Sequence, residues 1–340
     1  MRARRIVGLA AGLLLLCGGL AIAWVLEVDK SLDRPMDVPP AGGVLLVERG
    51  DTLREIARQL TRKGWLETPL HLALLGRWNG DAQRIKTGEF SVSPSTSPRQ
   101  LLAKLVAGDV VQHRVTLVEG WTFEKALGVI RSHPAIKRTL AEEGHLDNLR
   151  AFGLPGGPVE GRLLPDTYYF TRGTPDVEIV RRAFNAMETY LARVWVGRDE
   201  GLPLRDSSEA LILASIVEKE TGLPEERPRI AGVFIRRLNA NMRLETDPTV
   251  IYGLGKDFDG NLTRRDLRRP TPYNTYVNKG LTPTPIALPS RAAIDAVLHP
   301  ADGNSLFFVS RGDGSHHFSP TYAEHQRAVD KYQRRSKPRG

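Results

Sequence analysis

Residues 211–222, LILASIVEKETG, combine an apolar helical pattern with acidic side chains at its end. Residues three and four positions apart share one helix face, so Glu220 is expected beside Ile216 and Val217, among apolar neighbours. Gly222 predicts the end of the helix, which places Glu220 near the negative end of the helix dipole. Burial and the dipole both disfavour the ionised form. A carboxylic acid that keeps its proton near neutral pH is suited to protonate the departing oxygen of a glycosidic bond.

The neighbouring carboxylate, Glu218, belongs to a different stripe of the same helix, together with Ala214 and Ser215. Its expected role is hydrogen bonding or charge balance with Lys219 or a nearby arginine, and a direct part in catalysis is left open. A simpler interpretation of the segment is an ordinary solvated helix end in which neither glutamate performs chemistry. From this segment alone, both interpretations stand.

The N-terminus predicts where such chemistry takes place. Residues 6–26 form an uncharged, mostly apolar run of the length that spans a bilayer core. Arg2, Arg4 and Arg5 precede it and are expected to stay cytoplasmic, so the rest of the chain is exported. A cleaved signal peptide is the alternative, but the run is longer than a typical signal core and no clear cleavage site follows, which favours a retained anchor. The only cysteine, Cys17, lies in this run, so no disulfide holds the exported part.

Size and charge narrow the class of protein. The chain has 340 residues, of which 41% are hydrophobic and 26% charged, enough for two globular domains with their own cores. Its net charge of +9 suits anionic lipid headgroups, an acidic wall polymer or nucleic acid, and an exported location makes nucleic acid the least favoured. The arginines are scattered, so a solvated basic surface is the default explanation.

The first domain is expected after a linker rich in proline and glycine. Residues 44–47 predict a strand, 49–51 a turn and 52–60 a helix with apolar residues at helical spacing. Residues 47–60, VERGDTLREIARQL, resemble the opening of a LysM module, whose relatives bind glycans that contain N-acetylglucosamine. Residues 86–90 and a helix over 98–106 fit its continuation. A glycan-binding role and a purely structural role are equally open.

From residue 113 onward the pattern changes to alternating strands and helices, which predicts a second domain. Four separated segments of it belong together: EGRLLPDTYYF at 160–170, ASIVEKET at 214–221, MRLETDPTVIYGLG at 242–255 and TPYNTYVNKGLTPTPIALPS at 271–290. Through them the chain resembles the YceG-like family of endolytic murein transglycosylases, over essentially its whole length. The resemblance implies a membrane-anchored lytic enzyme that cuts peptidoglycan strands internally.

The resemblance also implies a role for Glu220, which matches the second glutamate of the family's EKET motif. Lytic transglycosylases use one carboxylic acid to protonate the glycosidic oxygen after N-acetylmuramic acid. As carboxylate, the same group then deprotonates that sugar's 6-hydroxyl, which closes onto C1 and gives a 1,6-anhydro end. One glutamate can therefore suffice, whereas most glycoside hydrolases need a pair of carboxylates.

The candidate substrate-binding residues carry side chains that can bond sugar hydroxyls or stack on a pyranose ring: Glu218, Thr246, Asp247, Tyr252, Tyr273, Asn274 and Thr275. For the segment 246–249 the alternative is a helix cap, because Asp-Pro-Thr is typical of helix starts. The loop after residue 271 is restricted by prolines, which favours a binding surface over a core element.

Two further groups of polar residues have structural interpretations. Asp166 and Glu160 flank a strand-like segment that is expected to pack, but a carboxylate opposite Glu220 would make ordinary hydrolysis the competing reaction. His316 and His317 follow a predicted hairpin turn and point to opposite sides of a strand, which argues against a shared metal. No other ligand cluster occurs in the sequence, so no metal and no cofactor are expected.

The sequence thus predicts an α+β fold with an N-terminal transmembrane helix, a small LysM-like α+β module and a larger mixed α/β catalytic domain. The expected divisions are a stub and anchor over 1–27, a linker over 28–43, the LysM-like module over 44–112, the catalytic domain over 113–335 and a basic tail over 336–340. The N-terminus is expected in the cytoplasm and the catalytic domain in the periplasm, anchored in the inner membrane.

The expected activity is cleavage of MurNAc–GlcNAc bonds within nascent glycan strands, which terminates their elongation. Two alternatives remain: a non-catalytic peptidoglycan-binding scaffold of the wall-synthesis machinery, and a water-using muramidase that leaves reducing ends. The expected partners are peptidoglycan glycan strands and the membrane, with peptidoglycan synthases as candidates and no nucleic acid.

Overall fold

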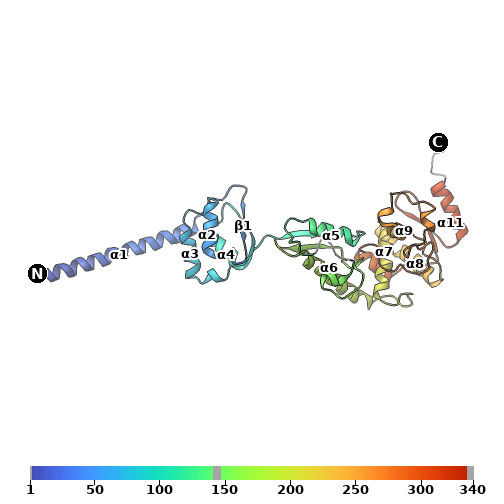
Figure 1. Ribbon diagram of the computed structural model, residues 1–340, viewed down its shortest axis with the longest axis horizontal. Helices are drawn as coiled ribbons and strands as arrows, with labels where there is room; N and C mark the ends of the chain where they lie inside the picture. Colours follow the sequence, from blue (N-terminus) through green and yellow to red (C-terminus); the bar gives the residue numbers. More distant parts are fainter. Residues whose placement is uncertain (1, 141–146, 335–340) are drawn as a thin grey trace, which may run out of the picture. The chain divides into compact units, whose positions relative to one another are not determined.

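The computed structural model describes residues 2–140 and 147–334, so the predicted basic tail over 336–340 lies outside the described residues. The chain divides into two compact units. Unit 1 comprises Met1–His113 with Phe170–Gly173, and unit 2 comprises Arg114–Tyr169 with Thr174–Gly340. Both units mix helices with short strands, as predicted (Figure 1).

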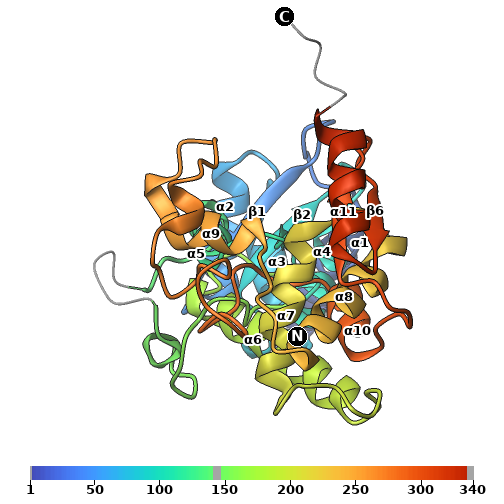
Figure 2. The ribbon, with the colours of Figure 1, turned by 90° about the vertical axis from the view of Figure 1, so that its right-hand side faces the viewer.

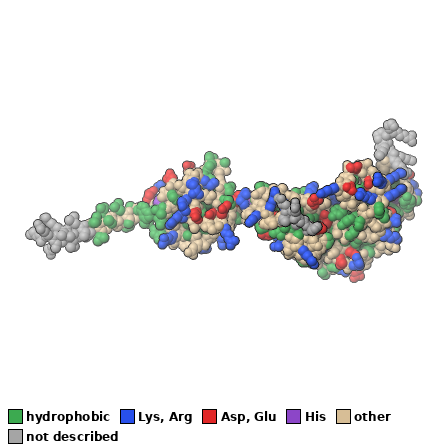
Figure 3. All heavy atoms as spheres, in the orientation of Figure 1, with side chains coloured by type: hydrophobic (Ala, Val, Ile, Leu, Met, Phe, Trp, Pro, Cys, Tyr) green, Lys and Arg blue, Asp and Glu red, His purple; other side chains and the backbone are tan. Residues whose placement is uncertain are grey.

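Unit 1 begins with one long helix, α1 (Arg2–Asp33). Among the described residues, its part over Gly12–Asp33 alone is long and apolar enough to cross a membrane, judged by length and composition. Figure 3 shows hydrophobic side chains along this part of the helix, and leucines such as Leu14 and Leu26 are exposed. The predicted apolar N-terminal helix is therefore confirmed, and it extends past residue 26.

The body of unit 1 packs three helices on a small antiparallel sheet, in which Leu45 pairs with Phe90. Its elements are β1 (Gly43–Val47), α2 (Leu53–Arg62), α3 (Pro69–Trp78), η1 (Asp81–Gln83), β2 (Gly88–Val92) and α4 (Pro98–Ala107). Thr52 caps α2 in a capping box with Glu55, which explains where this helix begins. The strand and the two helices predicted for this region are present. The likeness to a LysM module stays a prediction.

The last turns of α1 are part of the unit 1 core. Val28 and Leu32 are 3% exposed and pack with the body of the unit, since α1 contacts α3 and α4. Arg99 on α4 forms ion pairs with Asp29 and Asp33 of α1, each at 2.7 Å. Residues in the predicted linker over 28–43 therefore contribute buried side chains to unit 1, because the apolar residues among them have a core to pack against.

Unit 2 is largely helical, because its longest apolar stretches have helical periodicity. Among the described residues, strands pair only two at a time: β1 with β2, β3 (His113–Thr116) with β4 (Thr167–Phe170), and β5 (Phe307–Ser310) with β6 (His316–Ser319). The unit boundaries fall within β3 and β4. The elements from this point are β3 (His113–Thr116), α5 (Phe123–Ser132), η2 (Leu149–Phe152), β4 (Thr167–Phe170), α6 (Asp176–Trp195), α7 (Ser207–Glu220), η3 (Pro224–Glu226), α8 (Arg227–Asn239), α9 (Asp247–Leu254), η4 (Gly255–Asp257), η5 (Asp266–Arg268), α10 (Arg291–Leu298), β5 (Phe307–Ser310), β6 (His316–Ser319), α11 (Tyr322–Val329) and η6 (Asp330–Arg334).

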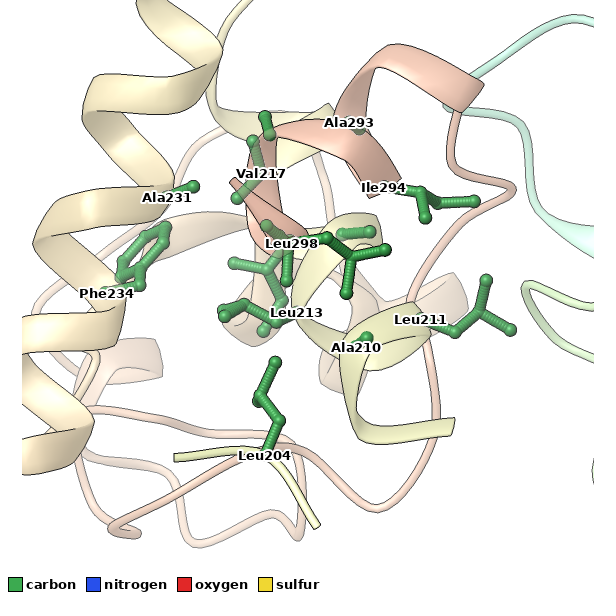
Figure 4. Close-up of a cluster of buried hydrophobic side chains, with 14 of the residues drawn as sticks. Leu204, Ala210, Leu211, Leu213, Val217, Ala231, Phe234, Ala293, Ile294 and Leu298 are labelled. Atoms are coloured by element: carbon green, nitrogen blue, oxygen red, sulfur yellow. The ribbon is translucent and has the colours of Figure 1, made fainter. Parts of the chain in front are cut away.

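Helix α7 lies in the core of unit 2, with α8 and α10 packed against it (Figure 2). Figure 4 shows Leu213 and Val217 of α7 among side chains of the neighbouring helices, including Phe234 and Leu298. The helix begins where Asp206 accepts hydrogen bonds from the backbone N–H groups of the first turn. Packing on several sides fixes this helix, and thereby the residue at its end.

The surface charge is mixed. On the face in Figure 3, Lys and Arg side chains are interspersed with Asp and Glu. The net charge of +9 therefore forms no single basic patch on that face, which agrees with the prediction of a solvated basic surface.

Candidate active site around Glu220

Glu220 is the last residue of α7 and is half-buried. Its neighbours on the helix face, Ile216 and Val217, are completely buried, as the helical spacing predicts. Thr221 leaves the helix in an extended conformation with φ −142°, and Gly222 does not adopt a left-handed conformation. The packed helix therefore ends at Glu220 and places its carboxyl group at the surface of the hydrophobic core.

The pKa of Glu220 is strongly perturbed. Burial raises the pKa of its carboxyl group to about 7, a hydrogen bond from Thr246 lowers it, and the negative charge of Asp247 raises it. A group with this pKa exists in both protonation states near neutral pH. It can therefore give up a proton and take one back in the same catalytic cycle.

Thr246 is the hydrogen-bond partner of Glu220. Its hydroxyl donates to the Glu220 Oε1, although Thr246 is also the N-cap residue of α9, where such a hydroxyl ordinarily accepts from the helix backbone. Behind it, the Thr246 N–H donates to Thr275 Oγ1 at 3.1 Å, and Thr249 donates to the Thr246 carbonyl at 2.7 Å. A buried threonine cluster thus holds the Thr246 hydroxyl on the carboxyl group.

Glu220 opens into a cavity of about 410 Å³. Arg237, Glu245, Asp247 and Tyr276 share this cavity with it. The Tyr276 hydroxyl donates to Asp247 at 2.6 Å, and burial together with this bond raises the pKa of the phenol, which stays protonated. Glu245 has a φ of 49°, a strained conformation for a residue with a side chain, and such strain is frequent at functional sites.

A second hollow, of about 490 Å³, also reaches Glu220. It is lined by the turn from Glu119 to Lys125 and by the end of α7. The Lys125 ammonium lies 4.7 Å from the centre of the Trp121 ring, and Lys219 donates to the Gly120 carbonyl at 3.3 Å. Glu220 is common to both hollows.

Glu218 performs a structural task in this geometry. Its carboxylate accepts from the N–H of Ser290 at 2.9 Å and from the Ser290 hydroxyl at 2.5 Å, and Arg227 lies at 3.5 Å. Ser290 is the N-cap residue of α10, so Glu218 fastens the start of that helix to α7. This arrangement corresponds to the hydrogen-bonding role expected for it, and a part in substrate binding stays a prediction.

Tyr252 and Tyr273 line a different cavity, of about 690 Å³, which Glu220 does not border. Their rings meet edge to face with centres 4.9 Å apart. The Tyr252 hydroxyl donates to Glu160 at 3.2 Å, and the Tyr273 hydroxyl is 2.8 Å from that of Thr284. A role for these tyrosines in binding substrate remains a prediction, and it would concern this second cavity.

Asn274 is completely buried and organises its own loop. Its side-chain amide donates to the carbonyls of Asp266, Leu267 and Arg269, and its oxygen accepts from the N–H of Tyr276. With these bonds made, the side chain has little capacity left for a sugar. Its predicted place in substrate binding is without support in this geometry.

The two other carboxylates considered from the sequence are engaged elsewhere. Glu160 accepts from the backbone N–H groups of Phe123 at 2.9 Å and Gly161 at 3.2 Å, and burial raises its pKa. Asp166 forms an ion pair with Arg291 at 2.9 Å. Neither borders the hollows at Glu220, whereas Asp247 does.

Several residues at Glu220 were not considered from the sequence: Arg237, Glu245, Phe307, Phe308, Tyr322 and His325. Glu245 lies inside a segment that carries the family resemblance, which was a usable signal. The aromatic residues near the C-terminus follow no motif and come together only through folding. Within residues 2–140 and 147–334, no group of three or more metal-ligating side chains is arranged to hold a metal ion.

The fold and site define a class: proteins with one N-terminal apolar helix, two compact units and a glutamate of raised pKa that borders two hollows of the second unit. The family is identified by comparison. The chain belongs to the YceG-like family, whose model matches residues 45–331.

Individual relatives agree with this family. The chain is 36% identical over 180 residues to the endolytic murein transglycosylase of Bacillus subtilis, an alignment that covers 52% of this chain and 48% of the relative. It is 26% identical over 317 residues to the endolytic murein transglycosylase of Streptococcus pneumoniae, with 83% and 57% covered. This chain thus spans about half the length of the curated relatives that it matches.

A solved structure has the same fold. The crystal structure of a putative YceG-like protein from Listeria monocytogenes superposes with a TM-score of 0.54 at 26% identity. The match covers 84% of this chain and 99% of the Listeria chain.

Proposed function

We propose that this protein is a membrane-anchored endolytic lytic transglycosylase that cleaves MurNAc–GlcNAc bonds in peptidoglycan. The observation that carries the proposal is Glu220, a carboxyl group with a pKa of about 7 that borders two hollows. A polymer that occupied both hollows would present an internal bond to Glu220, as endolytic cleavage requires. Family membership and the names of the Bacillus and Streptococcus relatives support the same activity.

The proposed reaction uses Glu220 twice. The protonated carboxyl group gives its proton to the glycosidic oxygen, the bond from that oxygen to C1 breaks, and the next sugar leaves as an alcohol. The 6-hydroxyl oxygen of N-acetylmuramic acid then bonds to C1, and its proton passes to the Glu220 carboxylate, which restores the starting state. No water is consumed. The attacking group belongs to the same sugar, so the ring closure gains from proximity.

Neighbouring residues support these steps in the proposal. Thr246 orients one oxygen of Glu220, and its hydrogen bond stabilises the carboxylate that must form after the first proton transfer. Asp247 opposes that ionisation, because its negative charge raises the pKa of Glu220. The two influences keep the group able to act as an acid and then as a base.

A hydrolytic muramidase is the second candidate, and one observation favours it. Asp247 lines the same cavity as Glu220, so this site contains a second carboxylate that could assist a water molecule. The Tyr276 hydroxyl already donates a hydrogen bond to Asp247 Oδ1, which leaves that oxygen less available to a water molecule and favours the single-glutamate mechanism.

The location and partners form part of the proposal. We expect α1 to span the inner membrane once, with its N-terminus in the cytoplasm and units 1 and 2 in the periplasm. Cleavage beside the membrane would act on newly made strands and end their elongation. Unit 1 could hold glycan, and peptidoglycan synthases are candidate partners.

The test is product analysis with the full-length protein in detergent and uncrosslinked peptidoglycan strands. Mass spectrometry should find internal fragments that end in 1,6-anhydro-N-acetylmuramic acid, and these should disappear with Glu220→Gln. Glu209→Gln is the matched control, because it changes a glutamate of the same helix that borders neither of the two hollows at Glu220. Reducing ends would indicate hydrolysis. A wild-type protein that binds strands but leaves them intact would favour the scaffold.

A further inference from the structure

One wall of the Glu220 cavity comes from the C-terminal part of unit 2. The hairpin of β5 and β6 packs with α11, and together they contribute aromatic and histidine side chains to the cavity that also contains Glu220. None of the residues expected from the sequence to bind substrate lies on this wall. We call it the hairpin wall, and its members at the cavity are Phe307, Phe308, Val309, Ser310, His316, Tyr322, His325 and Val329.

His316 on this wall is held in one orientation. Its Nδ1 is 2.6 Å from Glu226 Oε2, and its backbone N–H donates to Glu226 Oε1 at 2.9 Å. Glu226 is 6% exposed, so this bond is sheltered from water. A carboxylate only accepts hydrogen bonds, which assigns the proton of the neutral imidazole to Nδ1.

The other ring nitrogen of His316 is available to a ligand. Within the part of the chain that the structure describes, His316 Nε2 has no hydrogen-bond partner. It is also not one of the fully buried polar atoms that lack a partner. With Nδ1 protonated, Nε2 carries a lone pair and accepts a hydrogen bond. The cavity at Glu220 therefore contains an oriented acceptor that no described protein group engages.

Tyr322 supplies a flat apolar surface at the rim of the same cavity. Tyr322 is 63% exposed, so most of its ring is accessible to a ligand. The ring is supported from within the protein, because its centre lies 5.8 Å from that of Phe307, which in turn stacks on His325 at 5.3 Å and 24°. A supported, exposed ring can cover the apolar face of a flat ligand at little entropic cost.

The combination matches one ligand chemistry. A pyranose ring offers an apolar C–H face and a rim of hydroxyl donors, and the hairpin wall offers an aromatic surface and an oriented acceptor. We infer that Tyr322 and His316 form a saccharide subsite beside Glu220, in which a sugar of the glycan stacks on Tyr322 and donates a hydroxyl hydrogen bond to His316 Nε2. This inference rests on the proposed function and adds the residues that would position the strand.

A purely structural role is the competing explanation for His316. Through Glu226 it ties the hairpin to the segment before α8, so its loss could loosen the hairpin without any change in sugar contacts. Tyr322 has no such task, because its side chain is mostly exposed and makes only ring contacts. Variants of both residues therefore distinguish a saccharide subsite from a purely structural role.

The experiment measures binding and turnover separately. Full-length Glu220→Gln protein in detergent is titrated by calorimetry with a soluble oligosaccharide of alternating N-acetylglucosamine and N-acetylmuramic acid. In this background Tyr322→Ala should weaken binding about tenfold, a loss of about 1.4 kcal/mol, because the stacked ring is removed. Tyr322→Phe should bind like the parent. His316→Ala should weaken binding by about fivefold, and His316→Gln is the milder variant if the alanine variant does not fold.

His317→Ala is the matched control for His316. His317 is the next residue on β6, contacts the ring of Tyr332 and does not border the cavity, so its removal should leave affinity unchanged. With Glu220 intact, Tyr322→Ala should raise KM and leave kcat nearly unchanged, an effect that a loosened hairpin would not reproduce.

The outcomes of the two proposals are distinct. If the wild type and Tyr322→Ala cleave strands with the same KM, the proposed subsite is overturned and the proposed activity stands. A protein that binds the oligosaccharide through Tyr322 but never cleaves it would remove the activity and keep the subsite. Absence of binding with Tyr322 and His316 intact would overturn the subsite.

Discussion

Glu220 and Glu160 belong to two different cavities of unit 2, and burial raises the pKa of both carboxyl groups. Their hydrogen bonds differ. Glu160 accepts from two backbone N–H groups and from the Tyr252 hydroxyl, so both of its oxygens are engaged. Within residues 2–140 and 147–334, Glu220 accepts a hydrogen bond from Thr246 on Oε1 and none on Oε2, and it borders two hollows.

The difference teaches how to recognise a catalytic acid among buried carboxyl groups. A raised pKa indicates that a carboxyl group has been taken out of water, which occurs in structural sites as well as in reactive ones. The useful sign is an oxygen without a partner that faces space large enough for a substrate. Glu220 has this sign, whereas the oxygens of Glu160 are used to hold a turn and a helix start.

The contrast between Glu220 and Glu160 is tested most strongly by replacing each glutamate in turn with glutamine. Glu220→Gln should lower kcat for strand cleavage by about a thousandfold, because the proton donor is lost while the shape is kept. Glu160→Gln should retain activity. Rates of fragment release from peptidoglycan strands measure both, and comparable losses in the two variants would contradict the assignment.

Removal of the Glu160 side chain should mainly affect stability. In Glu160→Ala the N–H groups of Phe123 and Gly161 and the Tyr252 hydroxyl lose their acceptor. The free energy of unfolding should fall by about 2–4 kcal/mol, measured by urea denaturation. Glu124→Ala is the control, since this exposed glutamate borders the same cavity and should change stability by about 0.5 kcal/mol or less. Equal effects would show that Glu160 is not a structural anchor.

The pH dependence of stability sharpens the comparison further. The pKa of Glu220 lies at about 7 in the folded protein against an ordinary value of 4.5, so between these values the folded state binds more protons than the unfolded state. This group's contribution to the free energy of unfolding therefore decreases as pH rises from 4.5 to 7. Glu220→Gln lacks this dependence and should be more stable than the wild type by about 1–3 kcal/mol at pH 8, with allowance for partial exposure.

At pH 4 the two proteins should unfold alike, because the wild-type carboxyl group is then protonated in both states. Urea denaturation at both pH values measures the difference. A stability gain that is the same at pH 4 and pH 8 would mean that the Glu220 carboxyl group is not perturbed by burial.

The smallest expected effect concerns the single partner of Glu220. Thr246→Val removes a hydrogen bond that favours the carboxylate, so the pKa of Glu220 should rise and the upper limb of the pH–rate profile should move by about half to one pH unit. Thr249→Val is the matched control, since the Thr249 hydroxyl bonds Thr246 and Thr275 but not Glu220. A shift in both variants would assign the effect to general loosening of α9.

Much of the Glu220 site could be predicted because it depends on local structure. The apolar spacing of residues 211–217 predicts a buried helix, and the helix fixes where Glu220 lies. The segment 246–247 adjoins Glu220 as expected, since Thr246 bonds the carboxyl group and Asp247 shares its cavity. Its alternative interpretation, a helix start, is also correct, because α9 begins at Asp247.

The rest of the site depends on which cavity each side chain borders in the folded protein. Residues that are close in sequence need not border the same cavity. Tyr252 lies more than one helical turn beyond Asp247 along α9, which carries it to another cavity. Asn274 looked suited to sugars, but an irregular buried loop needs its own partners for its backbone carbonyls. The hairpin wall had no motif, because its rings meet through packing of β5, β6 and α11.

The domain organisation shows a similar limit. The prolines and glycines after residue 34 suggested a linker, yet Val28 and Leu32 are spaced like one face of a helix and are buried with Met36 and Val38. These four apolar residues stand among prolines and charged residues. Their spacing is too short a pattern to predict burial in a segment whose composition is typical of a linker. Their burial becomes evident only when α3 and α4 are seen to receive them.

The join between α1 and unit 1 has a mechanical consequence. The final turns of α1 pack into the core of unit 1, and Asp29 and Asp33 of α1 form ion pairs with Arg99. We therefore expect α1 and the body of unit 1 to move together. In a bilayer, any change in the tilt of α1, for example from a change in membrane thickness, would swing unit 1 with it. Unit 1 would thereby stay close to the lipid surface.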